Sequence, residues 1–257
     1  MIDTHAHIHD PKFDEDRIEM LARATAAGIE TILTIGTDLD DSERALAAAE
    51  AHGLHASIGI HPHEAIDAPA DIAAAFDALR ARFRIAPLAI GETGLDYYYD
   101  HSPHDVQQAV LRKQLAYARE HDLPLIFHQR DATDDFVAIL REAFVAPMRG
   151  VIHCFTGTTA EAKIFVDEFG LKLGIGGVST FKTAQGLRDA IAAVGIEPLI
   201  LETDCPYLAP IPHRGKRNEP AFMVESAKTV AATLGLSLEA TQAATTRTAR
   251  QLFFGDG

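Results

Sequence analysis

Six residues in the sequence have side chains that bind divalent cations, and each lies at or just after the end of a short apolar run. They are His5, His7, Glu92, His128, His153 and Asp204. Imidazole nitrogens and carboxylate oxygens suit zinc, manganese and magnesium. Two such ions held together activate a water molecule and stabilise the attacking and leaving oxygens of a displacement. The set therefore predicts a hydrolytic centre whose cofactors are two divalent metal ions, Mg²⁺, Mn²⁺ or Zn²⁺.

Glu92 is the residue expected to bridge the two ions and so to take part in catalysis. It follows the apolar run Leu88 to Ile90, which has β character and stops at Gly91. We expect a strand over Pro87 to Glu92, with the Glu92 carboxylate emerging where the buried strand ends. A carboxylate at that point can hold two cations at once.

Asp204 and His63 are the other expected catalytic residues. Asp204 closes an apolar strand, where a carboxylate can coordinate a cation and accept a proton from a metal-bound water. A simpler explanation for Asp204 is an Asx cap. His63 lies in the sequence His61-Pro62-His63, and a proline-stiffened turn can hold its imidazole toward a phosphoryl oxygen or a leaving group. We expect His63 to contact the substrate as well.

Each histidine also has a simpler explanation when it is considered alone. An H-x-H pair such as His5 and His7 can arise by chance in a chain with 13 histidines, although alternate residues of a strand do share one face. His128 and His153 can be satisfied by backbone carbonyls at strand ends. The combination of all four with Glu92 favours metal binding over these separate explanations.

Two arginines are expected to contact an anionic substrate. Arg130 follows His128 by two residues and can make bidentate contacts to phosphate, although it can equally pair with a nearby acid such as Asp131. Arg214 belongs to the basic cluster 213–217, which can guide an anionic polymer toward the site. The alternative for this cluster is a solvated loop.

Neighbouring residues receive other interpretations. Glu202 is expected to point to the face opposite Asp204 and to be either structural or a residue that supports a metal ligand without binding the ion. The glycine-rich stretch 174–177 lacks the spacing of a phosphate-binding loop and is expected to allow tight packing at a strand end. Tyr97-Tyr98-Tyr99 can present rings for base stacking, while loop packing is the simpler explanation for at least two of them. Neither cysteine is assigned as a ligand.

Short apolar strands alternate with amphipathic helices along the whole sequence. The expected strands cover residues 1–7, 29–36, 54–60, 87–92, 123–128, 150–154, 171–175 and 199–203. The expected helices cover residues 13–27, 42–52, 71–84, 105–121, 133–144, 159–169, 184–194, 221–234 and 238–253. Repeated βα units indicate parallel pairing, and eight of them can close. We predict an α/β fold, a (β/α)8 TIM barrel with the metal site at the C-terminal rim of its strands.

Length and composition fit one soluble domain over residues 1–257. The net charge of −14 excludes a broad cationic face for gripping duplex nucleic acid, but metal ions can supply positive charge locally. Two cysteines cannot form a disulfide framework, and the sequence lacks a secretion signal or an apolar run that spans a bilayer. We expect a cytoplasmic protein without a membrane or an obligate protein partner.

The chain resembles the TatD family of metal-dependent deoxyribonucleases, within the amidohydrolase-like barrels. The matching segments are DTHAHIHD, GIHPHEA, IGETGLDYYYD, LIFHQRDA, VIHCFTG, LETDCPYLAP, RGKRNEP and the tail Thr245 to Phe253. The resemblance implies one ion on His5, His7, Glu92 and Asp204, and a second ion on Glu92, His128 and His153. It also implies that His63 and Arg130 lie near the phosphate. Gln129, Cys205 and Arg247 to Ala249 depart from the family pattern, and none of them is a proposed ligand.

The resemblance implies a phosphodiesterase that removes nucleotides from the 3′ end of single-stranded DNA or RNA, so nucleic-acid ends are the expected partners. An alternative on the same barrel is a metal-dependent amidase, lactonase or D-aminoacyl-tRNA deacylase, because acyl chemistry can use the same activated water. A third hypothesis is a metal-binding module without catalysis. The full ligand set with a separate general base favours an enzyme.

Overall fold

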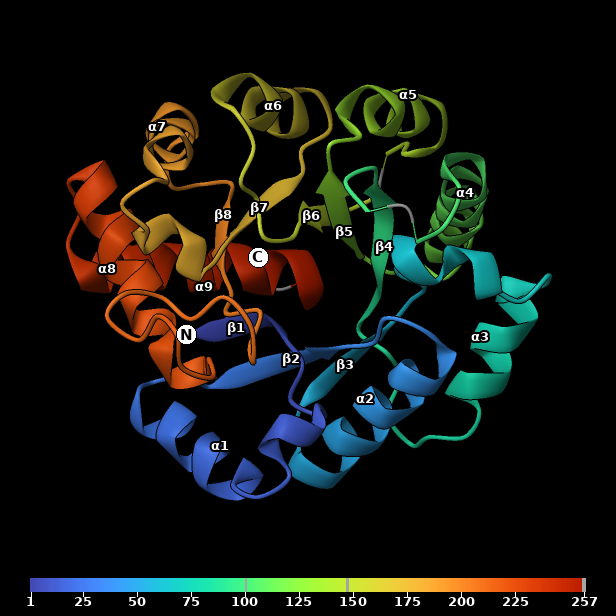
Figure 1. The fold of residues 1–257 in the computed structure, drawn as a ribbon, viewed down its shortest axis with the longest axis horizontal. Coiled ribbons are helices and arrows are strands. Elements are labelled where there is room, and N and C mark those ends of the chain that lie inside the picture. Colours follow the sequence, from blue (N-terminus) through green and yellow to red (C-terminus); the bar gives the residue numbers. More distant parts are fainter. Residues whose placement is uncertain (100, 147, 256–257) are drawn as a thin grey trace. The chain divides into compact units, whose positions relative to one another are not determined.

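Strands and helices alternate along the described chain, which comprises residues 1–99, 101–146 and 148–255 of a computed structural model (Figure 1). The strands are β1 Ile2–Ala6, β2 Thr31–Ile35, β3 His55–Ile58, β4 Ala89–Asp96, β5 Leu125–Arg130, β6 Gly150–Ile152, β7 Lys172–Ile175 and β8 Leu199–Leu201. The helices are α1 Arg17–Ala26, α2 Leu39–His52, α3 Ile72–Arg80, α4 His104–Glu120, α5 Thr133–Ala143, α6 Thr159–Lys163, α7 Gln185–Val194, α8 Met223–Leu234 and α9 Leu238–Phe253. The predicted alternation is confirmed.

The strands found in the described residues form one eight-stranded sheet in sequence order, from β1 to β8. The pairs β3–β4, β4–β5, β5–β6 and β7–β8 are parallel. A parallel bridge between Ala6 and Cys205 links β1 to the segment after β8. Consecutive neighbours in parallel, with the first strand meeting the last, define a (β/α)8 barrel. The predicted fold class is confirmed.

Contacts within the chain divide it into two compact units, residues 1–33 with 153–257 and residues 34–152. The first unit contains β1, β7 and β8, and the second contains β3 to β6. The prediction of a single domain over residues 1–257 stays a prediction. None of the helices within residues 1–99, 101–146 and 148–255 has the length and apolar character needed to cross a membrane.

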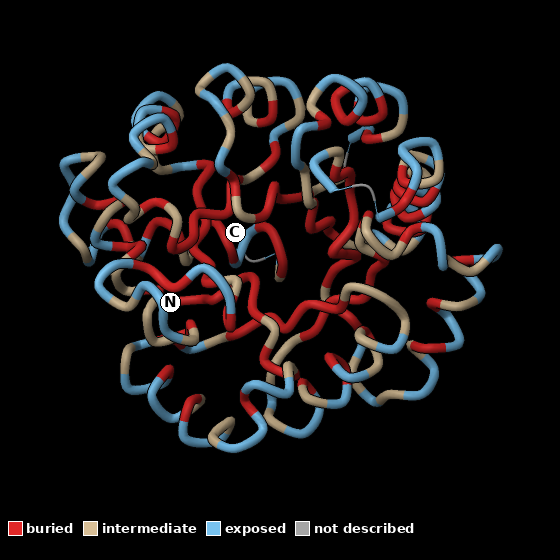
Figure 2. The backbone as a smooth tube through the Cα atoms, in the orientation of Figure 1, coloured by how far each residue is buried: buried red, intermediate tan, exposed pale blue. Residues whose placement is uncertain are grey.

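The first unit is built on buried strands and capped helices. All five residues of β1 and all three of β8 are buried, whereas the helices are exposed along one side (Figure 2). Ser237 caps α9 by accepting a hydrogen bond from the Ala240 amide, and Thr158 and Glu161 form a capping box at α6. The helix expected over 159–169 changes at Ile164 into a π-helical turn that ends at Glu168.

The second unit positions its strand ends through buried glutamines of α4. Gln114 accepts a hydrogen bond from the Ile60 amide and donates to the Ile60 carbonyl, at 2.9 Å each. It also donates to the Thr93 hydroxyl at 2.6 Å. The first two bonds satisfy the backbone amide and carbonyl of Ile60, in the segment after β3. The α4 helix therefore holds the segments that carry His61 and Glu92.

The expected end of the fourth strand is wrong. β4 continues past Glu92 to Asp96, and its last residues pair with Phe127 to Arg130 of β5, which begins and ends two residues later than expected. Gly94 has a φ of +148°, and a side chain there would overlap the His128 carbonyl. The glycine therefore permits close approach of two strands. Asp100, the last residue of the segment IGETGLDYYYD, lies outside the described residues.

Candidate metal centre

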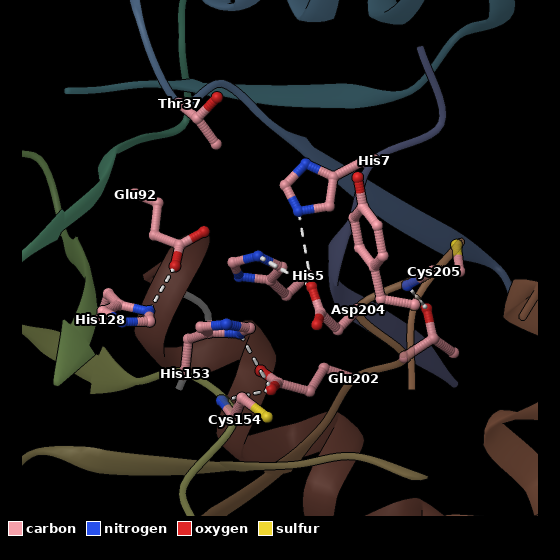
Figure 3. Close-up of polar contacts among 12 residues, drawn as sticks. His5, His7, Thr37, Glu92, His128, His153, Cys154, Glu202, Asp204 and Cys205 are labelled. Carbon is pink, nitrogen blue, oxygen red and sulfur yellow. Dashed lines mark hydrogen bonds and ion pairs between the residues drawn. The ribbon is translucent and has the colours of Figure 1, made fainter. Parts of the chain in front are cut away.

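The first unit brings two of the predicted ligands, His5 and His7, to the carboxylate of a third, Asp204. Nε2 of His7 lies 3.4 Å from Oδ1 of Asp204, and Nε2 of His5 lies 3.7 Å from the same oxygen. Figure 3 shows both imidazoles directed at Asp204. His5 and His7 reach one atom because they are alternate residues at the end of β1, as the sequence predicts. These spacings fit nitrogen and oxygen donors that share a cation.

The backbone holds Asp204 in an unusual conformation. Its φ is +57°, in the left-handed region that non-glycine residues seldom adopt. The amide of Asp204 donates to the His5 carbonyl at 2.8 Å, and the Asp204 carbonyl accepts from the Tyr207 amide at 2.9 Å. Such strain costs about 1–3 kcal/mol and persists where surrounding contacts determine the conformation. Here those contacts tie Asp204 to the strand that carries the two histidines.

Asp204 is ionised at neutral pH. Burial alone would raise its pKa, but the hydrogen bond from His7 and the charges of His153 and His5 outweigh that effect and lower it. A partly buried carboxylate held in the charged form can bind a cation or accept a proton.

His153, the residue directly after β6, also belongs to this group. Its ring stacks on His5 with centroids 3.5 Å apart, and its Nδ1 lies 3.1 Å from Oε1 of Glu202 (Figure 3). The same Glu202 oxygen accepts from the Cys154 amide at 2.5 Å. Glu202 therefore supports His153, in agreement with one of its two expected roles. β8 ends at Leu201, so the alternation of strand faces does not extend from Glu202 to Asp204.

Two sets of atoms in the first unit are close enough to hold a cation. His5, His153 and Glu202 offer ligand atoms within 4.8 Å of one another, and so do His153, Cys154 and Asp204. Oε2 of Glu202 is buried without a hydrogen-bond partner among the described residues, and such atoms are costly unless a ligand satisfies them. The residues fit a divalent ion. The remaining cysteine, Cys205, is fully buried, and burial raises the pKa of its thiol, so it stays protonated.

The second unit contains a separate group around Glu92. Oε1 of Glu92 lies 3.0 Å from Nδ1 of His128 and 3.4 Å from Nε2 of His61. Ligand atoms of all three residues lie within 4.8 Å of one another. Glu92 is 4 % exposed, so its charge needs a proton donor or a cation beside it.

His61 supports Glu92 as a hydrogen-bond donor. Its Nδ1 accepts a hydrogen bond from the His63 amide at 3.1 Å, so the proton of the neutral ring is on Nε2, the atom that faces Glu92. Burial lowers the pKa of His61 to about 4, against the opposing charge of Glu92. His61 is therefore neutral at pH 7, and it orients the Glu92 carboxylate.

Sequence reasoning missed Asp96, the last residue of β4. Its Oδ2 lies 3.0 Å from Nε2 of His63 and 2.9 Å from Nε2 of His128. Burial raises its pKa, but the hydrogen bonds from His128, from the Tyr99 amide and from His63 hold the pKa well below the ordinary value. The sequence does show an acid four residues after Glu92. Asp96 can be assigned to the site only if the strand is known to continue through Gly94.

Arg130 ends β5 and lies over two tyrosine rings. Its guanidinium carbon is 3.8 Å from the centroid of Tyr98 and 4.9 Å from that of Tyr99. Both rings are partly exposed, at 56 % and 43 %. Tyr97 instead stacks on His104 with centroids 3.6 Å apart. The guanidinium keeps polar edges that can meet phosphate while its flat face rests on the rings.

The basic cluster 213–217 is partly neutralised by its own unit. Arg217 forms two hydrogen bonds to the Asp16 carboxylate, at 2.7 and 2.8 Å. The buried Asn218 donates to the carbonyls of Thr203 and Tyr207, and these bonds fix the loop between Thr203 and Asn218. Arg214 lies over the Phe181 ring at 3.9 Å. The cluster is therefore anchored, and Arg214 is the member whose expected role in guiding substrate stays a prediction.

Comparison with known proteins finds similarity to one family over nearly the whole chain. The family described as TatD related DNase matches residues 2–254. The chain is 39 % identical over 254 residues to the uncharacterized metal-dependent hydrolase YabD of Bacillus subtilis, covering 98 % of each chain. It is 35 % identical over 260 residues to the 3′-5′ ssDNA/RNA exonuclease TatD of Rahnella, again covering 98 % of each.

A solved structure has the same fold over nearly the whole chain. The crystal structure of YJJV, a TatD homolog from Escherichia coli, superposes with a TM-score of 0.91 at 30 % identity, covering 99 % of this chain and 98 % of the other. The match extends over both units.

Proposed function

Because the chain belongs to the TatD related DNase family, we propose that it is a divalent-metal-dependent hydrolase that removes nucleotides from the 3′ end of single-stranded DNA or RNA. The observation that carries the proposal is the ionised Asp204 carboxylate, which lies 3.4 Å from His7 and 3.7 Å from His5. The 3′-to-5′ direction and the choice of single-stranded substrates follow the activity for which the Rahnella relative is named, and that relative is 35 % identical to this chain.

The chain offers a ligand group in each unit. In the first unit, His5, His7, His153 and Asp204 would hold an ion, and in the second unit Glu92 and His128 would do so. Bound divalent ions would lower the pKa of a water molecule and neutralise charge on phosphoryl oxygens. The bridging role of Glu92 stays a prediction.

The residues of the chain would handle the proton and the anion. Asp204 is charged at neutral pH and can accept the proton of the attacking water. His63 can contact the leaving oxygen, because its imidazole is held by the Asp96 carboxylate at 3.0 Å. Arg130, supported on Tyr98, can stabilise negative charge on the phosphate.

The proposal is tested with purified protein, short 5′-labelled single strands and added Mg²⁺ or Mn²⁺. We expect stepwise shortening from the 3′ end, stopped by a chelator and restored by metal. Asp204→Asn and Glu92→Ala should lower the rate by about 100-fold or more, as expected for ligands and general bases. Asp16→Asn, on the ion pair with Arg217, is the matched control, and its rate should stay near that of the wild type.

A substrate panel separates phosphodiester from acyl chemistry. Esters, amides, lactones and aminoacyl-tRNA are assayed beside the oligonucleotides with the same protein and metal. Metal-dependent hydrolysis of an acyl substrate with intact oligonucleotides would refute the proposal and support the amidase, lactonase or deacylase alternative.

A further inference from the structure

One buried carboxylate connects two histidines of the second unit. A single oxygen of Asp96, Oδ2, lies 3.0 Å from Nε2 of His63 and 2.9 Å from Nε2 of His128. The other oxygen, Oδ1, accepts from the amides of Tyr98 and Tyr99, at 3.0 Å each. Asp96 itself is 0 % exposed.

These four contacts saturate the carboxylate. An ionised carboxylate has about four lone-pair positions and donates nothing. The Asp96 backbone is fixed too, because its amide donates to Oε1 of Gln107 at 2.8 Å and its carbonyl accepts from Nε2 of Gln107 at 3.0 Å. The orientation of the carboxylate is thus determined by the turn on one side and by α4 on the other.

A carboxylate with only acceptor sites determines where each ring carries its proton. Each imidazole presents Nε2–H to Asp96, so Nδ1 of each neutral ring keeps its lone pair. For His128 this holds when a cation lies between Nδ1 and the Glu92 carboxylate, because that carboxylate would otherwise attract a proton to Nδ1. Nδ1 of His128 lies 3.0 Å from Oε1 of Glu92. Two lone-pair atoms at that separation suit the coordination of one cation by both.

We propose that Asp96 is a positioning residue that places the proton of both His63 and His128 on Nε2, so that each ring acts through Nδ1. His128 then offers Nδ1 to a divalent ion, and His63 offers Nδ1 to the substrate. The catalytic meaning rests on the proposed nuclease function, whereas the proton positions can be measured without any activity.

Asp96→Asn distinguishes this role from simple packing. The amide has the same shape but only one acceptor oxygen, and the Tyr98 and Tyr99 amides both require that oxygen. The NH₂ group then faces the two rings, so each Nε2 becomes an acceptor and its proton moves to Nδ1. Gln107→Ala is the matched control, since it loosens the backbone of Asp96 and keeps the carboxylate.

The measurement is long-range ¹H–¹⁵N correlation of the histidine rings, in the Zn²⁺-loaded protein and in metal-free protein about two pH units above the ordinary histidine pKa. His63→Ala and His128→Ala assign the signals. Wild type and Gln107→Ala should show Nε2–H on both rings in the Zn²⁺-loaded protein, and on His63 in the metal-free protein. In the loaded wild type, Nδ1 of His128 should carry the shift of a metal-bound nitrogen.

Asp96→Asn should show Nδ1–H on both rings in the metal-free protein, and its Zn²⁺ affinity should fall by about 10–100-fold, as for other residues that orient metal ligands. Its kcat on oligonucleotides should fall more than its KM rises. Nδ1–H on either ring of the Zn²⁺-loaded wild type, or on neutral His63 of the metal-free wild type, would overturn the proposal even if Asp96→Asn fails to fold. Unchanged protons in a folded Asp96→Asn would overturn it too. Loss of nuclease activity in the wild type, with the expected proton positions, would refute only the proposed function.

Discussion

Nε2 of His7 lies 3.4 Å from Oδ1 of Asp204, although His7 follows the first strand and Asp204 follows the last. The Asp204 amide donates to the His5 carbonyl at 2.8 Å, so the backbone itself brings the two segments together. This relationship explains why a carboxylate in the left-handed region is retained there: its position is set by β1 and by the turn to Tyr207.

Removal of the His7 imidazole should weaken metal binding in the first unit. His7→Ala deletes one nitrogen ligand beside Asp204, and we expect the Kd for Zn²⁺ or Mn²⁺ to rise by about 10–100-fold. Isothermal titration with the metal alone measures the change. His213→Ala is the control, because His213 stacks on Phe222 outside the group and should leave the Kd within about twofold. Equal Kd values for wild type and His7→Ala would contradict the assignment.

Burial of neutral His61 should make stability depend on pH in the metal-free protein. Its pKa falls from an ordinary value of about 6.5 to about 4 in the folded state. Between these values the unfolded chain binds more protons, so the free energy of unfolding rises with pH. The stabilisation is complete above about 6.5 and is lost as the pH falls toward 4.

His61→Asn should flatten this dependence, because asparagine keeps a donor toward Glu92 and does not titrate. Urea unfolding between pH 4 and 7 measures the slopes. Parallel slopes for wild type and His61→Asn would show that another group causes the dependence.

Arg130 should contribute to substrate binding more than to the stability of the fold. It is exposed, and its guanidinium lies 3.8 Å from the Tyr98 ring centroid. Arg130→Ala removes both the charge and the fork of donors, so we expect KM for oligonucleotides to rise by about 10-fold with a Tm change of only a few degrees. Arg130→Lys should recover only part of this loss, since lysine cannot contact phosphate with two parallel donors. An unchanged KM would exclude Arg130 from the substrate site.

Gly94 should be intolerant of any side chain. Its φ of +148° and the nearby His128 carbonyl leave no room for a Cβ atom. Gly94→Ala should destabilise the protein by about 3 kcal/mol or more, as strain and overpacking combine. Gly186→Ala in α7 is the control, since a Cβ there meets no atom within 4 Å and alanine favours helix. Thermal unfolding of both variants provides the comparison.

The sequence was sufficient to predict the fold class and the alternation of strands and helices, because buried parallel strands and amphipathic helices have different apolar periods. It also identified His5, His7 and Asp204, which the first unit brings together. The grouping of Glu92 with His128 in the second unit was expected on the same grounds.

Local signals could not locate Asp96. The apolar run Leu88 to Ile90 stops at Gly91, so the strand was expected to end at Glu92, whereas pairing with β5 extends it to Asp96. The support of Arg130 by Tyr98 and the contact of Glu202 with His153 were equally hidden. Each depends on residues that are distant in sequence and on backbone paths that no local pattern specifies.

The most direct test of the central claim measures bound metal and nucleotide release on the same preparations of wild type, Glu92→Ala and Asp204→Asn. We predict that the wild type binds two divalent ions per chain and shortens single strands from the 3′ end. Each variant should bind less metal and lose at least about 99 % of that rate. Wild-type metal content and wild-type release in both variants would contradict the account.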